Sequence, residues 1–551
     1  MVPRATWKRW RMASVVLDGR REPSGPIVEV LEAEGIVLGP PQMLRRTRYD
    51  TFDGRLYRSG LRLEARTRGA EGHALVVTAG NGPPARLFLS APLVPTEPLA
   101  VGTLPPGPLR SRLLTTAADR ALLPQVTLRS ARRSGTAVDA DGIPLVTVHL
   151  DSDLEITRPG TRPGTGVEAT DALAWTIEVE ELPGRRKPAR ALLKTLRRAL
   201  AVDTAPPAAV EGDALERAAI AAEVDRRGWR GPVRPDLDRH GAALVGVRQV
   251  LRSFADALDA NWEGTVDHLD DEFLHDLRIA VRQTRSLLTE SRRILPKDVR
   301  SEQREAFRWL GTVTSPARDL DVYIAGWRTL TAPLSDADAR ALEPVLAHLA
   351  GQQASAHAEV AQALRSRTAR QLREDWRAWL ELPEAEVVGG KHARKPLGEM
   401  IGARISAAQH QLLVDGRLID AGSPAVQLHE LRKDGKRLRY LLEGFGHLGG
   451  RKRSRAVIRH LKDLQDNLGA HQDAEVQADR LRRALAELTD VAADEGAGEL
   501  TPATLAAGER LATILDRRQD AERANFHDRF AAYDDKRARR TVEDLVARMS
   551  R

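Results

Sequence analysis

Two segments of the chain carry a histidine followed by three basic residues at the same helical spacing. The first is LHDLRIAVRQTRSLL, residues 274–288, and the second is LHELRKDGKRLRYLL, residues 428–442. The basic residues stand three, seven and ten positions after the histidine, so on a helix they fall within a stripe roughly 80° wide and about 15 Å long. Guanidinium and ammonium groups gathered along one stripe favour an anionic ligand, because each forms charge-assisted hydrogen bonds to oxyanions.

The two segments match at the histidine, at every basic position and at the flanking leucines. The matched pairs, each 154 residues apart, are His275 with His429, Arg278 with Arg432, Arg282 with Lys436, and Arg285 with Arg439. The same offset carries Arg308 onto Lys462 and Asp319 onto Asp473. A constant offset over some 45 residues without a gap indicates an internal duplication.

A single arginine-rich helix face is usually only solvated surface, and a lone histidine on a helix usually caps or packs. The duplication favours a binding site, because both copies keep a basic residue at all three positions, where a solvated face tolerates Glu or Gln. The leucines form a band more than about 100° away, so one face packs and the basic face stays available.

The composition narrows the choice of anion. Aromatic residues make up only 4% of the chain, and Tyr440 is the one aromatic residue within the two stripes, so platforms for stacked bases are lacking. The sequence contains no glycine-rich phosphate loop and no dinucleotide fingerprint. A linear chain of phosphates therefore fits the stripes better than a nucleic acid, although nonspecific nucleic-acid binding remains an alternative.

The elements that must position these residues divide the chain into two parts. Residues 27–181 alternate in the manner of strands, as in LRLEAR, PQVTLRS, PLVTVHL and AWTIEVEE, and a basic helix is predicted over Lys187–Leu200. The Pro/Ala-rich segment AVDTAPPAAVEGD has the composition of a linker. From about residue 235 onward Leu and Ala recur at helical spacing, with a break near Glu384–Pro396.

Residues 240–545 resemble the CHAD family, a histidine-bearing α-helical domain. The resemblance lies in His-x-x-Arg-x-x-x-Arg/Lys-x-x-Arg, followed about 40 residues later by LGTVTSPARDLD in one copy and LQDNLGAHQDAE in the other. It implies two four-helix bundles related by pseudo-twofold symmetry around a basic channel that binds polyphosphate. The binding positions it implies are His275, Arg278, Arg282, Arg285, Arg308, His429, Arg432, Lys436, Arg439 and Lys462, with Lys433 and Arg437 as additions. Gly435 replaces Val281 of the first copy, which either weakens the helix by about 1 kcal/mol or lets another helix approach.

The first part resembles the CYTH family, whose β-tunnel binds triphosphates, through RRTRYDTFDGRLYRSGLRLEAR, QVTLRSARRSGTAVDADGIPLVTVHLDSD and WTIEVEEL. The family's Glu-x-Glu-x-Lys strand, which holds divalent metal, is missing where TWKRWRMASVVL stands, and HALVVTAG lacks the central lysine. Glu178 and Glu180 remain on one strand face as half a metal site, and Arg62 and Arg66 could face phosphate. We therefore expect a degenerate domain, with a metal-dependent triphosphatase as the alternative function.

These observations predict a multidomain α+β protein. We expect a basic segment at 1–26, a degenerate antiparallel β-tunnel or barrel-like CYTH domain at 27–202, a linker at 203–234, and an all-α CHAD-like domain at 235–551 with repeats at 240–385 and 400–545. The function expected is non-enzymatic polyphosphate binding, with no catalytic residue, metal or cofactor. The chain has no cysteine, and no apolar run is long enough for a membrane span, which suits a cytoplasmic protein that could be targeted to polyphosphate granules.

Overall fold

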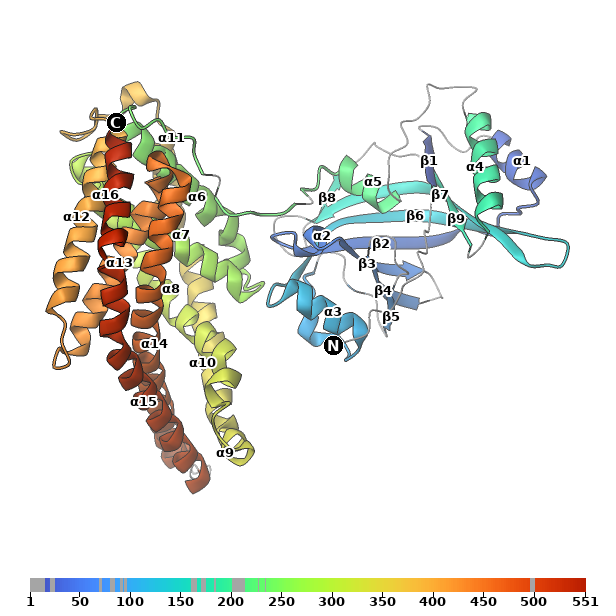
Figure 1. Ribbon diagram of the computed structural model, residues 1–551. Helices are drawn as coiled ribbons and strands as arrows, with labels where there is room; N and C mark the ends of the chain where they lie inside the picture. Colours follow the sequence, from blue (N-terminus) through green and yellow to red (C-terminus); the bar gives the residue numbers. More distant parts are fainter. Residues whose placement is uncertain are drawn as a thin grey trace. The chain divides into compact units, whose positions relative to one another are not determined.

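The computed structural model divides into two compact units, Met1–Arg230 and Gly231–Arg551, shown in Figure 1. It describes residues 15–19, 25–68, 72–79, 85–89, 93, 97–159, 166–169, 175–182, 185–200, 214–225, 227–232, 234–495 and 501–551. Most of the basic segment 1–26, most of TWKRWRMASVVL, and the Pro/Ala-rich residues 201–213 lie outside these ranges. In the described part of the chain, no helix is long and apolar enough to span a membrane.

The first unit is built on one antiparallel sheet, as predicted. Its strands are β1 (Val15–Gly19), β2 (Gln42–Thr51), β3 (Leu61–Arg68), β4 (Gly72–Ala79), β5 (Ala85–Leu89), β6 (Leu122–Val138), β7 (Pro144–Pro159), β8 (Gly166–Ala169) and β9 (Trp175–Glu181). They follow the order β1-β9-β7-β6-β2-β3-β4-β5, with β8 paired to β7. The alternating runs identified in the sequence are strands β3, β4, β6, β7 and β9 of this sheet.

Helices cover the apolar face of the sheet. Helices α1 (Gly25–Ala33) and α4 (Arg186–Leu200) pack in a core with Leu150, Ile177 and Val179, and the predicted basic helix is α4. Helices α2 (Arg55–Arg58) and α3 (Pro108–Ala117) pack on Leu63 and Leu75 at the other end. Alternation along each strand places polar side chains such as Arg46 and Glu64 on the opposite face, beside a smaller apolar cluster around Val126 and Leu128.

The sheet unit reaches beyond the limits 27 and 202 that the sequence suggested. Strand β1 pairs with β9, so part of the segment 1–26 belongs to the sheet. Helix α5 (Ala214–Ala221), within the range assigned to a linker, packs on Val126 and Leu128, and its Glu216 binds the buried Arg48 at 2.7 Å. A short helix after a Pro/Ala-rich stretch is stabilised by such long-range contacts, which composition does not reveal.

The second unit is all-helical, as predicted. Its helices are α6 (Ala243–Val266), α7 (Asp271–Glu290), α8 (Lys297–Thr331), α9 (Asp336–Ala341), α10 (Glu343–Arg365), α11 (Arg367–Glu381), α12 (Leu397–Leu418), α13 (Ala425–Phe445), α14 (Arg451–Glu495), α15 (Pro502–Tyr533) and α16 (Lys536–Ser550). Helices α6, α7 and α8 begin at residues 243, 271 and 297, and α12, α13 and α14 begin 154 residues later. The repeat found in the sequence is therefore a repeat of three whole helices.

Each half buries the leucines of its stripe-bearing helix. Helix α7 packs against α6 and α8, and α13 packs against α12 and α14. Leu277 and Leu431 are fully buried, which matches the predicted packing face. The chain breaks between α11 and α12, where a Cβ on Gly390 would lie 2.5 Å from the carbonyl oxygen of Arg293. The break therefore needs glycine for a close approach, as well as Pro396 to start α12.

Candidate anion-binding site

Helix α7 begins directly before the first stripe. The Asp270 side chain accepts hydrogen bonds from the backbone N–H groups of Glu272 and Phe273. The acidic residues in the first turn interact favourably with the positive end of the helix dipole. Helix α13 begins after Pro424 and has no side-chain cap. At Gly435 a Cβ would meet only the Gln465 side chain, at 3.5 Å, so this glycine is not required by a close helix approach.

Arg278 lies between α7 and α8 and is half-buried. Its Nη1 donates to the Gly311 carbonyl at 3.0 Å and to Thr314 Oγ1 at 2.9 Å. Burial lowers the pKa of Arg278 to about 10, with Arg282 and Arg318 acting in the same direction against Asp319. The helix therefore holds a cation where solvation is poor and other cations are close, which favours an incoming anion.

His275 stands one turn before Arg278. Burial lowers the pKa of His275, and the Arg318 guanidinium on α8 adds to this effect, so both disfavour the charged ring. Further along, Arg282 and Arg285 are exposed. The guanidinium of Arg285 is nevertheless partly screened from solvent, and this desolvation, followed by the cations Arg308 and Arg304, lowers its pKa.

The second stripe repeats this arrangement on α13. His429 Nδ1 lies 2.5 Å from Gln472 Oε1, at the position that corresponds to Arg318 in the first copy. Arg432 Nη2 lies 3.5 Å from Asp473 Oδ1, the counterpart of Asp319. Both copies thus place the head of the stripe against the same part of the following long helix.

Lys436 connects the two stripes electrostatically. Burial, and then the cations Arg432 on its own helix and Arg282 on α7, lower the pKa of Lys436 to about 8. Helices α7 and α13 are in direct contact. The two sets of cations therefore face a common region of the helical unit instead of lying on unrelated surfaces.

Four of the predicted residues are exposed and paired with acids on their own helices. These pairs are Arg308 with Glu305, Lys433 with Glu430, Arg439 with Glu443, and Lys462 with Asp466. Exposed pairs at this spacing contribute little to stability, because water and salt screen them. Such cations can exchange a carboxylate for another anion at low cost.

Arg437 differs from the other predicted residues. Its Nε and Nη2 donate to the two carboxylate oxygens of Glu290 at 2.6 and 3.1 Å, and the Glu290 side chain is only 2% exposed. Glu290 ends α7 in the first half, whereas Arg437 belongs to α13 in the second. This bidentate pair joins the two halves, and it neutralises a buried carboxylate.

Sequence reasoning missed three basic residues beside the stripes. Arg318 on α8 lies near His275, Arg304 lies near Arg285, and Arg480 on α14 lies near Asp319. Arg304 and Arg308 are one turn apart on α8, which is a usable sequence signal. Arg318 and Arg480 have no basic counterpart at the offset of 154, since Gln472 and Gly326 stand there, so the repeat does not reveal them.

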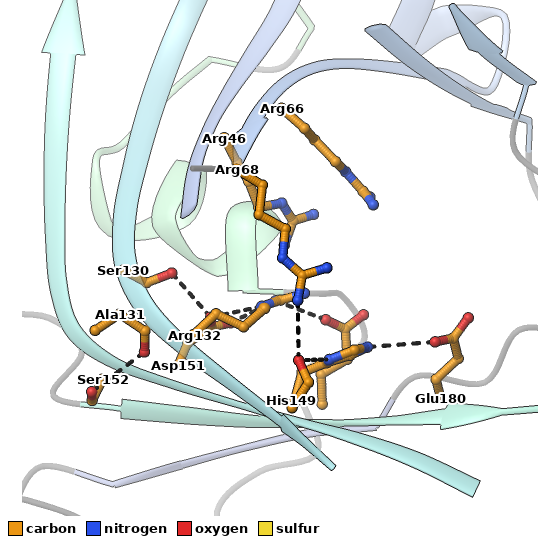
Figure 2. A network of polar contacts seen from close by, with 12 residues as sticks. Arg46, Arg66, Arg68, Ser130, Ala131, Arg132, His149, Asp151, Ser152 and Glu180 are labelled. Atoms are coloured by element: carbon orange, nitrogen blue, oxygen red, sulfur yellow. Dashed lines mark hydrogen bonds and ion pairs between the residues drawn. The ribbon is translucent and has the colours of Figure 1, made fainter. Parts of the chain in front are cut away.

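The polar face of the sheet is the second candidate site (Figure 2). Arg132 donates to both oxygens of Asp151, at 2.8 and 2.6 Å, and to Glu178 at 3.1 Å. His149 Nε2 lies 3.4 Å from Glu180, and this contact lowers the pKa of that glutamate. Both glutamates of the predicted half metal site are therefore held by side-chain cations or donors.

Arginine side chains surround these acids. Arg46 and Arg66, which are opposite one another on β2 and β3, both bind Glu64. No three acidic or histidine ligand atoms converge in the described part of the first unit. The acids named on this face are thus each in contact with an arginine or a histidine. Arg62 is exposed, and its contact with phosphate stays a prediction.

The comparisons with known proteins identify the helical part. The family model described as the CHAD domain matches residues 249–482, which include both stripes. These residues form a CHAD domain. The match lies inside the range 240–545 over which the sequence resembles this family, so that prediction is confirmed. No curated protein matches the chain.

Several solved structures are similar to parts of the chain. The CHAD domain from the plant Ricinus communis is 26% identical, with a TM-score of 0.44, and the match covers 54% of this chain and 96% of that one. PptA from Streptomyces chartreusis is 18% identical, with a TM-score of 0.40, over 53% of this chain and 99% of its own. A Bacillus halodurans protein described as a candidate adenylate cyclase is 15% identical, with a TM-score of 0.25, over 38% and 98%.

The pair between Arg437 and Glu290 predicts a stability effect at the contact between the two halves of the CHAD domain. Arg437→Ala leaves a buried carboxylate without its partner, so the free energy of unfolding should fall by about 1–3 kcal/mol. Adding Glu290→Gln should restore part of the loss, because the buried charge is removed. Lys433→Ala, which breaks an exposed pair on the same helix, is the matched control and should cost under about 0.5 kcal/mol. Equal losses in Arg437→Ala and Lys433→Ala by denaturant unfolding would contradict this role.

Because Arg282 on α7 lies near Lys436 on α13, the pKa of Lys436 should depend on the charge of Arg282. The Lys436 ammonium should titrate near pH 8, and Arg282→Gln should raise its pKa because one neighbouring positive charge is removed. NMR of selectively labelled lysine measures this directly. Arg292→Gln, at an exposed position beyond the end of α7, is the control and should leave the pKa unchanged. An unchanged Lys436 pKa in Arg282→Gln would show that the two stripes do not share a region.

Proposed function

We propose that the CHAD domain binds inorganic polyphosphate, without catalysis, through the stripes of α7 and α13. The observation that carries this proposal is the place of Lys436, which is half-buried with Arg432 of its own stripe and Arg282 of the other stripe as neighbouring cations, on two helices that are in contact. A cluster of cations that suppress one another's charge gains most from an anion that neutralises several of them at once. The CHAD family in general is associated with polyphosphate binding.

The proposed ligand residues divide by exposure. Arg282, Arg285 and Arg439 are exposed and would contact phosphate first, whereas Arg278 and Lys436 lie deeper. Arg308, Lys433 and Lys462 would extend the contact by exchanging the acids of their own helices. We assign Arg437 to the contact with Glu290 and not to the ligand.

A phosphate chain explains the site better than a nucleic acid. Within the two stripes Tyr440 is the one aromatic side chain, and it is half-buried, so stacked bases have little support. A chain with a charge on every unit and no bases needs only the spaced cations that the stripes provide. Targeting of the protein to polyphosphate granules would follow from such binding.

The first prediction from this proposal concerns pairs of arginines and lysines on each stripe. Arg282→Ala with Arg285→Ala should weaken binding of long-chain polyphosphate at least about ten-fold, because each charge-assisted contact is worth about 1.5–3 kcal/mol. Lys436→Ala with Arg439→Ala should do the same. Titration of the full-length protein by calorimetry measures both.

The control for these variants is Arg517→Ala with Arg518→Ala, which removes the same charge from exposed positions on α15. It should bind nearly as tightly as the original protein. The logarithm of the affinity should fall linearly with the logarithm of salt concentration, and less steeply in the stripe variants. Unchanged affinity in both stripe variants, with circular dichroism intact, would contradict the site.

We also propose that the sheet unit does not hydrolyse triphosphates. Among the residues that the structure describes, the acids Asp151, Glu178 and Glu180 are engaged by Arg132 and His149 and are therefore poorly placed to hold Mg²⁺ or Mn²⁺ together. Full-length protein with either metal should release no phosphate from triphosphate or nucleoside triphosphates above the metal-only background. Metal-dependent release that disappears in Glu178→Ala with Glu180→Ala would contradict this and would support a triphosphatase.

A further inference from the structure

A cluster of three possible metal ligands lies at the end of α7 that precedes the first stripe. His268 follows α6, Asp271 is the first residue of α7, and His357 belongs to α10. Each offers one ligand atom, and these atoms lie within 4.8 Å of one another. His268 Nε2 is already 3.2 Å from Asp271 Oδ1, close to the separation of about 3.4 Å between two ligands on a tetrahedral zinc ion.

The burial and hydrogen bonding of His357 independently indicate a metal ligand. Its side chain is 3% exposed, and its Nε2 lies 2.7 Å from Asp321 Oδ1, on a carboxylate that is 1% exposed. Its Nδ1 is buried and has no hydrogen-bond partner. A buried ring nitrogen without a partner is costly, whereas a histidine that gives one nitrogen to a carboxylate and the other to a metal is the usual arrangement of a metal ligand.

The charges around Asp321 point the same way. Asp321 Oδ1 also accepts from Gln353 Nε2 at 2.9 Å, and the Arg318 guanidinium is 3.9 Å from Oδ2, at the outer limit of an ion pair. A buried carboxylate needs a positive charge nearby. A metal on Nδ1 of His357 supplies that charge through the ring, and it avoids a buried N–H that has no acceptor.

The rings of His268 and His357 are stacked, with centroids 3.5 Å apart and planes 12° from parallel. His268 is exposed and adopts a left-handed backbone conformation, with φ of 47°. Because the side chain of His268 is exposed, its ring can rotate so that one of its nitrogens and one of His357 bind the same ion. The repeat shows that the fold does not require these residues, because Gly422 and Ala425 stand at the corresponding positions of the second half.

We propose that His268, Asp271 and His357 bind a single divalent transition-metal ion of the zinc class. Two imidazole nitrogens and one carboxylate oxygen suit Zn²⁺, while Mg²⁺ and Ca²⁺ prefer oxygen ligands alone. Asp321 is a positioning residue that orients the His357 ring. The ion joins α6, α7 and α10, and it stiffens the start of the helix that carries His275 one turn later.

Zn²⁺ titrated into tag-free, metal-stripped full-length protein tests this proposal, with no phosphate compound present. One equivalent should bind and raise the melting temperature, Mg²⁺ should not, and Co²⁺ should give the visible absorption of a four-coordinate site. His268→Asn and Asp271→Asn should each weaken Zn²⁺ binding at least about ten-fold. Both positions are at the surface end of helices, and Asn tolerates the backbone conformation of His268.

The control is His410→Asn, an exposed histidine on α12 outside the cluster, which should bind Zn²⁺ as the original protein does. Absence of a one-to-one Zn²⁺ complex would overturn the proposal. Equal binding in His268→Asn, Asp271→Asn and His410→Asn would overturn it as well, because it would place the ion elsewhere. Polyphosphate binding is measured separately, so either proposal can fail without the other.

Discussion

Repulsion among the cations of α7 and α13 is the constraint around which the helical unit is organised. Burial lowers the pKa values of Arg278 and Lys436, and neighbouring cations add to this effect, so holding these like charges close together costs the folded chain free energy. The leucines on the opposite helix faces compensate, since they are buried in both halves. The pair between Arg437 and Glu290 adds an attraction where the two halves meet. The fold thus keeps an unfavourable charge arrangement in place, which is expected where a ligand relieves it.

In the sheet unit, arginine side chains are neutralised by acids of the same unit. Its polar face also carries several arginines, but acids on the same face are paired with them, as Glu64 is with Arg46 and Asp151 is with Arg132. Arg48 forms a buried ion pair with Glu216 of α5. In the sheet the protein provides its own counter-ions, whereas the stripes of the helical unit depend on exposed acids that can be exchanged.

The sequence predicted correctly those features that depend on the regular spacing of residues along a helix or strand, or on the internal repeat. The stripes, the helix break near Gly390 and the strand runs follow from spacing, and the CHAD domain follows from the duplicated motif. It fell short where a contact joins distant segments. Helix α5 is held by Val126 and Arg48, and β1 by β9, which no local pattern shows. Arg437 looked like one more stripe cation, because the buried Glu290 that it meets is 147 residues away.

If one phosphate chain contacts both stripes at once, binding must depend on the length of the chain. Affinity of the full-length protein should be measured by calorimetry for polyphosphates of defined length. We expect affinity to rise with length until a chain reaches from one stripe to the other, then to level off, because the second stripe is engaged at high effective concentration. Removing the cations of either stripe should abolish that rise. An affinity per chain that does not change with length, or a rise that persists without one stripe, would show that a single chain does not bridge the two stripes.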